Sequence, residues 1–102
     1  MTDDQSQVLL TVVAPPALSH ELVDWLLEHT GSGYFSYQGR GHGMHAHAMS
    51  ISEQVAGRQR KEVFQIHCEW QQAQQWLSQL RGDFQGAGLH YWVVPVLVSG
   101  SL

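Results

Sequence analysis

The sequence predicts a small α+β domain built from two successive strand–helix–strand units. Three observations support this prediction. Apolar runs near both ends are rich in β-branched residues, two more polar stretches carry apolar side chains at helical spacing, and a long central segment follows neither pattern. A chain of 102 residues is long enough for one hydrophobic core and too short for two. We therefore expect a single domain over residues 1–102.

The first half of the chain contains the first predicted unit. Residues 8–14 are continuously apolar and are followed by two prolines, a pattern typical of a buried strand. Ser19 is the expected N-cap of the next element. That element is a helix, because apolar residues recur in it at helical spacing; they include Leu22, Trp25 and Leu26. Residues 34–38 then form a short aromatic strand.

The second half repeats this order. Residues 60–70 alternate between a mostly apolar and a mostly polar face, as in a strand with one buried side. A helical stripe follows, made of Ala73, Trp76, Leu77, Leu80 and Phe84, and residues 91–98 form the last strand. The order βαββαβ is that of the ferredoxin-like fold, a four-stranded antiparallel sheet with two helices on one face. Its first and third strands are central, so Pro95 lies on an edge strand, where proline is tolerated.

Composition and charge narrow the class of protein. The formal net charge is −4, with only five Lys and Arg, so nucleic-acid binding is not expected. No apolar run approaches the roughly 20 residues of a membrane helix, and the acidic, polar N-terminus is unlike a secretory signal. The single cysteine, Cys68, excludes an intramolecular disulfide and is expected to be a buried, inert thiol. We expect a soluble cytoplasmic protein that is not embedded in a membrane.

The long connection at about residues 39–57 is the first candidate binding element, because loops of this length are often functional. His42, His45 and His47 place three imidazoles within six residues of it. Imidazole ligands suit Zn, Cu or Ni, so these histidines are candidate ligands of a transition metal ion. The alternative is a solvated loop whose histidines bind nothing specific.

A cluster of basic residues is the second candidate. Arg58, Arg60 and Lys61 follow the long connection, and Arg40 precedes it. Clustered guanidinium groups favour phosphate or carboxylate. The alternative is a charged strand entrance that only keeps the protein soluble.

The glycine-rich turn before the last strand is the third candidate. Gly86 and Gly88 would let backbone N–H groups approach an anion, although a turn that merely ends the helix explains them equally well. The chain has no Ser-His-Asp or Cys-His signature, so we do not expect an enzyme.

Three runs carry a resemblance to a known family. They are GRGHG at 39–43, SEQVAGRQRKEVFQI at 52–66 and GAGLHYWVVPVLVSG at 86–100. With the order of elements, they make the chain resemble the PII-like superfamily, which includes the nitrogen regulatory protein P-II and the divalent-cation tolerance proteins. It looks closest to an uncharacterised PII-like branch associated with heavy-metal efflux.

The resemblance implies a homotrimer that binds small ligands, often adenine nucleotides, in clefts between subunits. It also implies that residues 39–57 form a regulatory T-loop that contacts a target such as a membrane transporter, and that residues 85–89 correspond to the loop that holds nucleotide phosphates. Two features depart from this pattern. His90 and Tyr91 stand where that loop is usually followed by a lysine, and the C-terminal arginines of true PII proteins have no counterpart. Adenine-nucleotide binding in the PII manner is therefore not expected.

The sequence thus predicts a trimeric PII-like signalling protein, a regulator that senses a small ligand and acts through a flexible loop. A link to transition-metal homeostasis and heavy-metal resistance is the leading hypothesis. One alternative is a PII-like regulator that binds a nucleotide or another anion and has no metal role. The other is a structural partner protein.

Overall fold

The structure of the chain is a computed structural model that describes residues 6–31, 33–42 and 58–102. Its elements follow the predicted order. They are β1 (Gln7–Ala14), a short 3₁₀ helix (Pro16–Leu18), α1 (Ser19–His29), β2 (Phe35–His42), β3 (Arg58–Glu69), α3 (Trp70–Asp83) and β4 (His90–Pro95).

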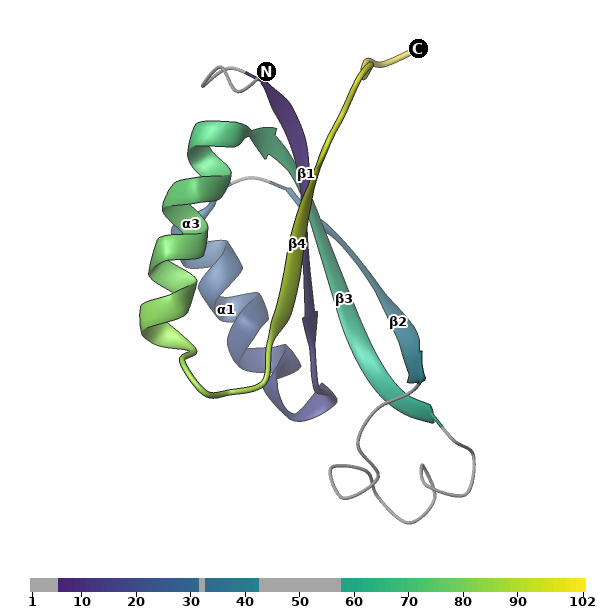
Figure 1. Ribbon diagram of the computed structural model, residues 1–102, viewed down its shortest axis with the longest axis vertical. Helices are drawn as coiled ribbons and strands as arrows, with labels where there is room; N and C mark the ends of the chain where they lie inside the picture. Colours follow the sequence, from purple (N-terminus) through teal and green to yellow (C-terminus); the bar gives the residue numbers. More distant parts are fainter. Residues whose placement is uncertain (1–5, 32, 43–57) are drawn as a thin grey trace.

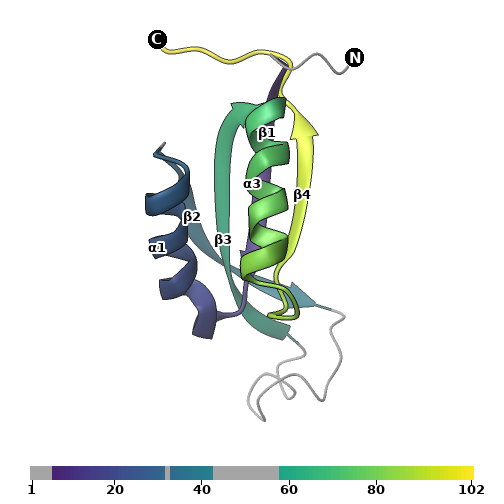
Figure 2. The same ribbon diagram turned by 90° about the vertical axis from the view of Figure 1, so that its left-hand side faces the viewer.

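The four strands form one antiparallel sheet in the order β2-β3-β1-β4. Both helices pack on the same face of this sheet (Figure 1), and the view turned by 90° shows them side by side in front of it (Figure 2). The first and third strands are central and β4 is an edge strand, so the predicted ferredoxin-like α+β fold and the edge position of Pro95 are confirmed.

The core lies between the sheet and the two helices. The register aligns Leu10 with Ile66 and Val12 with Phe64, and all four side chains are almost completely buried. Alternate residues of a strand point to one face, and these four point toward the helices. Each helix contributes its apolar stripe to the same cluster: Leu22, Trp25 and Leu26 from α1, and Ala73, Trp76, Leu77 and Leu80 from α3.

The start of α1 differs from the prediction. Ser19 is the first residue of the helix rather than its N-cap, and Leu18 occupies the cap position without a side-chain hydrogen bond. The two prolines explain the difference, because Pro16 begins a 3₁₀ turn that leads directly into α1. The hydroxyl of Ser19 instead donates to Oε1 of Glu62 on β3, at 3.4 Å.

The start of α3 was also placed incorrectly from the sequence. Trp70 was predicted to end the strand, but it is the first residue of the helix. The reason is a capping box: Glu69 is the N-cap, and the backbone N–H of Glu69 donates to Oε1 of Gln72 at 3.2 Å. Such reciprocal bonds satisfy backbone donors at a helix start.

The last strand is shorter than predicted. β4 ends at Pro95 rather than Val98, and the N–H of Val96 makes one further bond, 3.0 Å long, to the carbonyl of Gln7. Gln7 is the first residue of β1. In the described part of the chain no strand continues past Gln7 on this side, and residues 96–102 lie outside β4.

The predicted connection at 39–57 begins too early. Gly39 to His42 belong to β2 and pair with residues 61 to 58 of β3, while residues 43–57 of the predicted T-loop lie outside the described residues. The glycines resemble a loop in sequence, but the hydrogen-bonded ladder with β3 holds them in a strand. Gly39 also fits closely, because a Cβ there would lie 3.3 Å from Cγ2 of Val63.

Candidate anion-binding site

The free end of the β2–β3 hairpin collects most of the positive charge of the chain. Arg40 lies opposite Arg60, His42 lies opposite Arg58, and Lys61 lies opposite Gly39. Four of the five Lys and Arg residues are therefore at this position. We call Arg40, Arg58, Arg60 and Lys61 the basic hairpin end. The register thus aligns Arg40, which precedes the long connection, with Arg60, which follows it.

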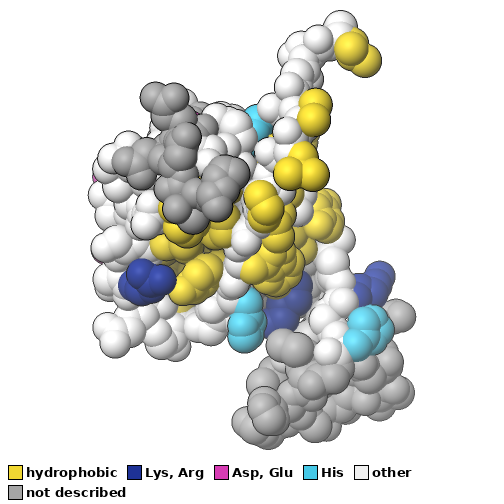
Figure 3. Space-filling view, turned by 45° about the horizontal axis from the view of Figure 1, so that its top comes forward, with side chains coloured by type: hydrophobic (Ala, Val, Ile, Leu, Met, Phe, Trp, Pro, Cys, Tyr) yellow, Lys and Arg dark blue, Asp and Glu magenta, His cyan; other side chains and the backbone are white. Residues whose placement is uncertain are grey.

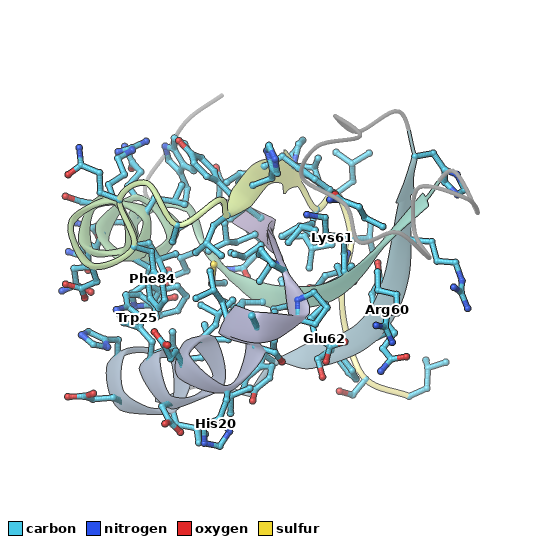
Figure 4. All side chains as sticks on the ribbon, turned by 90° about the horizontal axis from the view of Figure 1, so that it is seen from below. His20, Trp25, Arg60, Lys61, Glu62 and Phe84 are labelled. Carbon is cyan, nitrogen blue, oxygen red and sulfur yellow. The ribbon has the colours of Figure 1, made fainter. Side chains whose placement is uncertain are left out.

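The strand register decides which face each basic residue occupies. Arg40 and Arg60 are a directly opposed pair and share the helix-covered face with Glu62. Lys61 belongs to the other face, and Figure 4 shows Lys61 and Arg60 on opposite sides of β3. The register therefore divides the basic residues between the two faces, with Arg40 and Arg60 on the helix-covered face and Lys61 on the other.

Two hollows flank the basic hairpin end, one on each face of the sheet. Gly39, Arg40 and Lys61 border both of them. The hollow on the helix side has a volume of about 380 Å³ and is completed by Pro16, Ser19, Gln38, Arg60 and Glu62. The hollow on the opposite side has a volume of about 470 Å³ and is completed by Val13, Gly41, Val63, His90, Tyr91 and Trp92.

Electrostatics favours the second hollow as an anion site. The helix-side hollow contains the carboxylate of Glu62, which repels an anion. The second hollow has no acidic residue among those that line it in the described part of the chain, and it combines Arg40 and Lys61 with the ring of Trp92. A cation beside an aromatic ring can bind an anion that also carries a flat apolar group.

The face of the sheet away from the helices carries exposed apolar side chains. We call this the open face. Phe35 is 80% exposed and Trp92 is 51% exposed, with Tyr37 and Val94 also exposed. Thr11, at the centre of this face, is nevertheless fully buried; its hydroxyl accepts a 3.4 Å hydrogen bond from Nε2 of Gln65. Figure 3 shows the hydrophobic side chains continuing from the sheet along the C-terminal segment.

Of the three histidines predicted to bind a metal, the structure describes one, His42. His42 is exposed at the end of β2, while His45 and His47 lie outside the described residues. Within the described ranges, no three His, Cys, Asp or Glu residues come together in a way that could hold a metal ion. Cys68 is buried and the adjacent His67 is exposed, so this pair cannot share an ion.

The glycine turn before β4 reaches the same end of the sheet as the basic hairpin end (Figure 2). Gly86 and Gly88 both have positive φ, at 77° and 89°, a conformation that glycine adopts without strain. The N–H of Ala87 donates to the carbonyl of Phe84 at 3.1 Å, so the turn ends α3. The turn is followed by His90, which lines the hollow on the open face of the sheet.

Sequence reasoning missed two features. Trp92 and Tyr91 were assigned only to a strand, yet both line the hollow beside Lys61; the continuously apolar run at 91–98 carries no signal for this. The second is His29, whose ring stacks on Trp25, with ring centroids 4.3 Å apart. The indole N–H of Trp25 in turn donates to Oδ2 of Asp83, at 2.7 Å. This contact joins α1 to the end of α3 and is structural.

The fold and the basic hairpin end together define a small ferredoxin-like domain with a candidate anion site. The chain belongs to the family described as "Protein of unknown function (DUF3240)", whose model matches residues 4–102. It is similar to the crystal structure of a DUF3240 family protein from Shewanella baltica OS155, with a TM-score of 0.74 and 21% sequence identity. The match covers 95% of this chain and 97% of that one. At this identity the likeness shows the fold alone.

The search of curated proteins finds no match. Among the described residues, neither helix is long and apolar enough to cross a membrane.

Proposed function

We propose that this chain is a PII-like regulatory protein that senses a small anion at the basic hairpin end and reports it through residues 43–57. The observation that carries the proposal is the position of Arg40 and Lys61, which border the hollows on both faces of the hairpin. Residues 43–57 connect the same two strands, β2 and β3. An anion held there would sit at the base of that segment, where binding could be transmitted to a partner.

The chemistry of the hollows supports an anion rather than a cation. Arg40 and Lys61 line both hollows and Arg60 lines the one on the helix side; positive side chains repel a divalent ion and attract a phosphate or carboxylate. Gly86 and Gly88 lead into His90, at the rim of the open-face hollow. The proposed site has Arg40 and Lys61 at its centre. We also include Arg58, Arg60, Gly86 and Gly88, which belong to the same end of the sheet.

Calorimetric titration with ATP, ADP and inorganic phosphate tests this proposal. We expect saturable binding of at least one of them with a dissociation constant below about 1 mM, and loss of that binding in Arg40→Gln/Lys61→Gln. Glu28→Gln is the control, because Glu28 is an exposed charged residue of α1 that lines neither hollow. Equal binding by wild type and the double variant, or no binding of any of the three, would contradict an anion site here.

Metal binding is the second candidate, because His42 is exposed where β2 leads into the segment that contains His45 and His47. We propose Zn²⁺, Cu²⁺ or Ni²⁺ as the ions to test, with a role in transition-metal homeostasis. Titration of wild type and a His42→Ala/His45→Ala/His47→Ala variant separates the two candidates. Retained anion affinity in this variant, together with lost metal affinity, would show two independent sites. No ion bound more tightly than about 1 mM would exclude the metal role.

The open face supports a homo-oligomer, and the PII-like resemblance favours a trimer. Several large apolar side chains exposed on one face of a sheet are typical of a protein–protein contact. We expect sedimentation velocity to show an oligomer for wild type and a monomer for Phe35→Asp. Leu27→Asp is the control, because Leu27 is a comparably exposed apolar residue on α1. A wild-type protein that remains monomeric at high concentration would contradict the trimer.

The proposed target is a cytoplasmic surface of a membrane transporter or efflux component, contacted through residues 43–57. Replacing residues 44–56 with a Gly-Ser linker of equal length should abolish co-purification of such a target from its own cells. The same replacement should leave the unfolding midpoint of the domain unchanged. Unaltered co-purification would assign the contact to another surface.

A further inference from the structure

A third hollow lies between the end of α3 and the sheet. Its lining is mostly apolar, unlike that of the helix-side hollow beside the basic hairpin end. Its volume is about 510 Å³, within the range of pockets that hold small organic ligands. Most of the wall is apolar, formed by Val12, Leu77, Leu80, Phe84, Leu89 and Tyr91. Val12 is almost completely buried at the floor, whereas Phe84 and Leu89 are only partly buried.

The local fold explains why this hollow is open. The apolar stripe of α3 covers the sheet as far as Leu80, and the helix ends three residues later at Asp83. The chain then returns to β4 through Gly86 and Gly88, whose positive φ angles direct it around the end of the helix. No further side chain of the described residues fills the space between this turn and the sheet, so apolar wall surface stays accessible.

One basic residue stands at the rim. Nη2 of Arg81 donates a 2.9 Å hydrogen bond to the hydroxyl oxygen of Tyr91, and Cζ of Arg81 lies 5.7 Å from the centre of the same ring. These two contacts hold the guanidinium beside the hollow. Arginine has five N–H donors, and the bond to Tyr91 uses one of them.

The hollow has no acidic residue among those that line it in the described part of the chain. The nearest carboxylate in sequence, that of Asp83, accepts the indole N–H of Trp25 instead. Arg81 therefore gives an apolar hollow a positively charged rim. Guanidinium groups match carboxylates in shape and charge, whereas the wall offers an apolar group burial away from water.

We propose that this hollow binds a small apolar carboxylate, with its hydrocarbon body against Leu77, Leu80 and Phe84 and its carboxylate on Arg81. The hydroxyl of Tyr91, which accepts from Arg81, is free to donate its own proton to the second carboxylate oxygen. This site is separate from the proposed anion site. It shares only Tyr91 with the open-face hollow and no residue with the helix-side hollow.

Methyl-resolved NMR titration of the full chain with octanoate and with octanol tests the proposal. Octanoate should shift the methyl signals of Leu77, Leu80 and Leu89 saturably. In Arg81→Gln the affinity for octanoate should fall by about tenfold or more, as expected for loss of a charge-assisted bond, while the affinity for octanol should change less than about twofold. Arg81 is exposed, so this variant should fold; Arg81→Lys should recover part of the octanoate affinity.

The variant Arg40→Gln/Lys61→Gln separates this site from the proposed function. It should bind octanoate as wild type does, whatever its affinity for phosphate or nucleotides. The proposal is overturned if octanoate produces no saturable shift of the lining methyl groups. It is also overturned if Arg81→Gln weakens octanoate and octanol equally, or if the double variant weakens octanoate as much as Arg81→Gln does.

Discussion

The two faces of the sheet both carry large apolar side chains, but only one face is covered. On the covered face Leu10 and Phe64 are almost completely buried beneath α1 and α3. On the open face Phe35 is four-fifths exposed and Trp92 is half exposed. Side chains of each strand point alternately to the two faces. The faces differ in burial because α1 and α3 cover only one of them. This difference indicates that the covered face forms the core of the domain, while the open face contributes little to it.

The largest expected difference between the faces concerns two phenylalanines. Phe64→Ala should lower the free energy of unfolding by about 3–5 kcal/mol, because it removes a buried ring and leaves a cavity. Phe35→Ala should change it by less than about 0.5 kcal/mol at concentrations where the protein is monomeric. Urea unfolding monitored by circular dichroism measures both. Similar losses for the two variants would contradict the assignment of the core to one face.

The second prediction concerns the hydrogen bond from Trp25 on α1 to Asp83 at the end of α3. Asp83→Ala should cost about 1–2 kcal/mol of unfolding free energy, because it leaves the N–H of the buried Trp25 without its acceptor. This loss is partly offset, since a carboxylate at the C-terminal end of a helix is unfavourable. Asp83→Asn keeps an oxygen acceptor and removes the charge. It is therefore the matched control and should remain within about 0.5 kcal/mol of wild type.

The capping box that begins α3 should have a smaller effect. Glu69→Ala removes the side chain that accepts from the N3 backbone N–H and should destabilise the fold by about 1 kcal/mol. Gln71→Ala changes an exposed residue in the same turn and is expected to be nearly neutral. Thermal unfolding of the two variants makes the comparison. Equal midpoints for both would mean that packing alone holds this end of α3.

The last test compares two adjacent residues on opposite faces, Cys68 and His67. Burial, aided by the charge of Glu69, raises the pKa of the Cys68 thiol from 9.0 to about 11. The unfolded chain therefore ionises this thiol at a lower pH than the folded chain does. The associated stability is fully present below about pH 9 and is lost as the pH rises toward about 11.

Unfolding free energies of wild type and Cys68→Ala, measured from about pH 8 to pH 11, isolate this effect from the other groups that titrate there. The wild-type curve should fall more steeply than that of the variant. His67→Ala, on the exposed side, should keep the wild-type slope. Parallel curves for wild type and Cys68→Ala would show that the thiol is not held in an apolar environment.

The order of elements and the composition of the core could be predicted because both depend on local periodicity. The spacing of apolar residues shows which face of a strand or helix will be buried, whatever it packs against. This holds for residues 8–14 and for the stripe from Ala73 to Leu80. The element ends were less predictable. Gly39 to His42 have a loop-like composition and become a strand only because β3 lies alongside them. Trp70 begins a helix because the capping box at Glu69 forms there.

The candidate sites were likewise predictable only where their residues are close along the chain. The sequence indicated that Arg40, Arg58 and Arg60 flank one connection, which placed them near each other. It did not indicate that Lys61 would share a hollow with Trp92 and His90, because those residues belong to strands separated by β1. The hollow beside Arg81 was not foreseen at all. Its wall combines β1, α3 and β4, and no local pattern reports such a combination.

The sequence by itself therefore determined the βαββαβ order, the residues that form the core and the collection of positive charge at one connection. These follow from periodicity and from charges that are close along the chain. The tertiary structure alone decided the strand register. Because successive side chains of a strand point to opposite faces, the register sends Arg60 toward the helices and Lys61 to the open face. It also leaves Phe35 and Trp92 uncovered, since both helices pack against the other side.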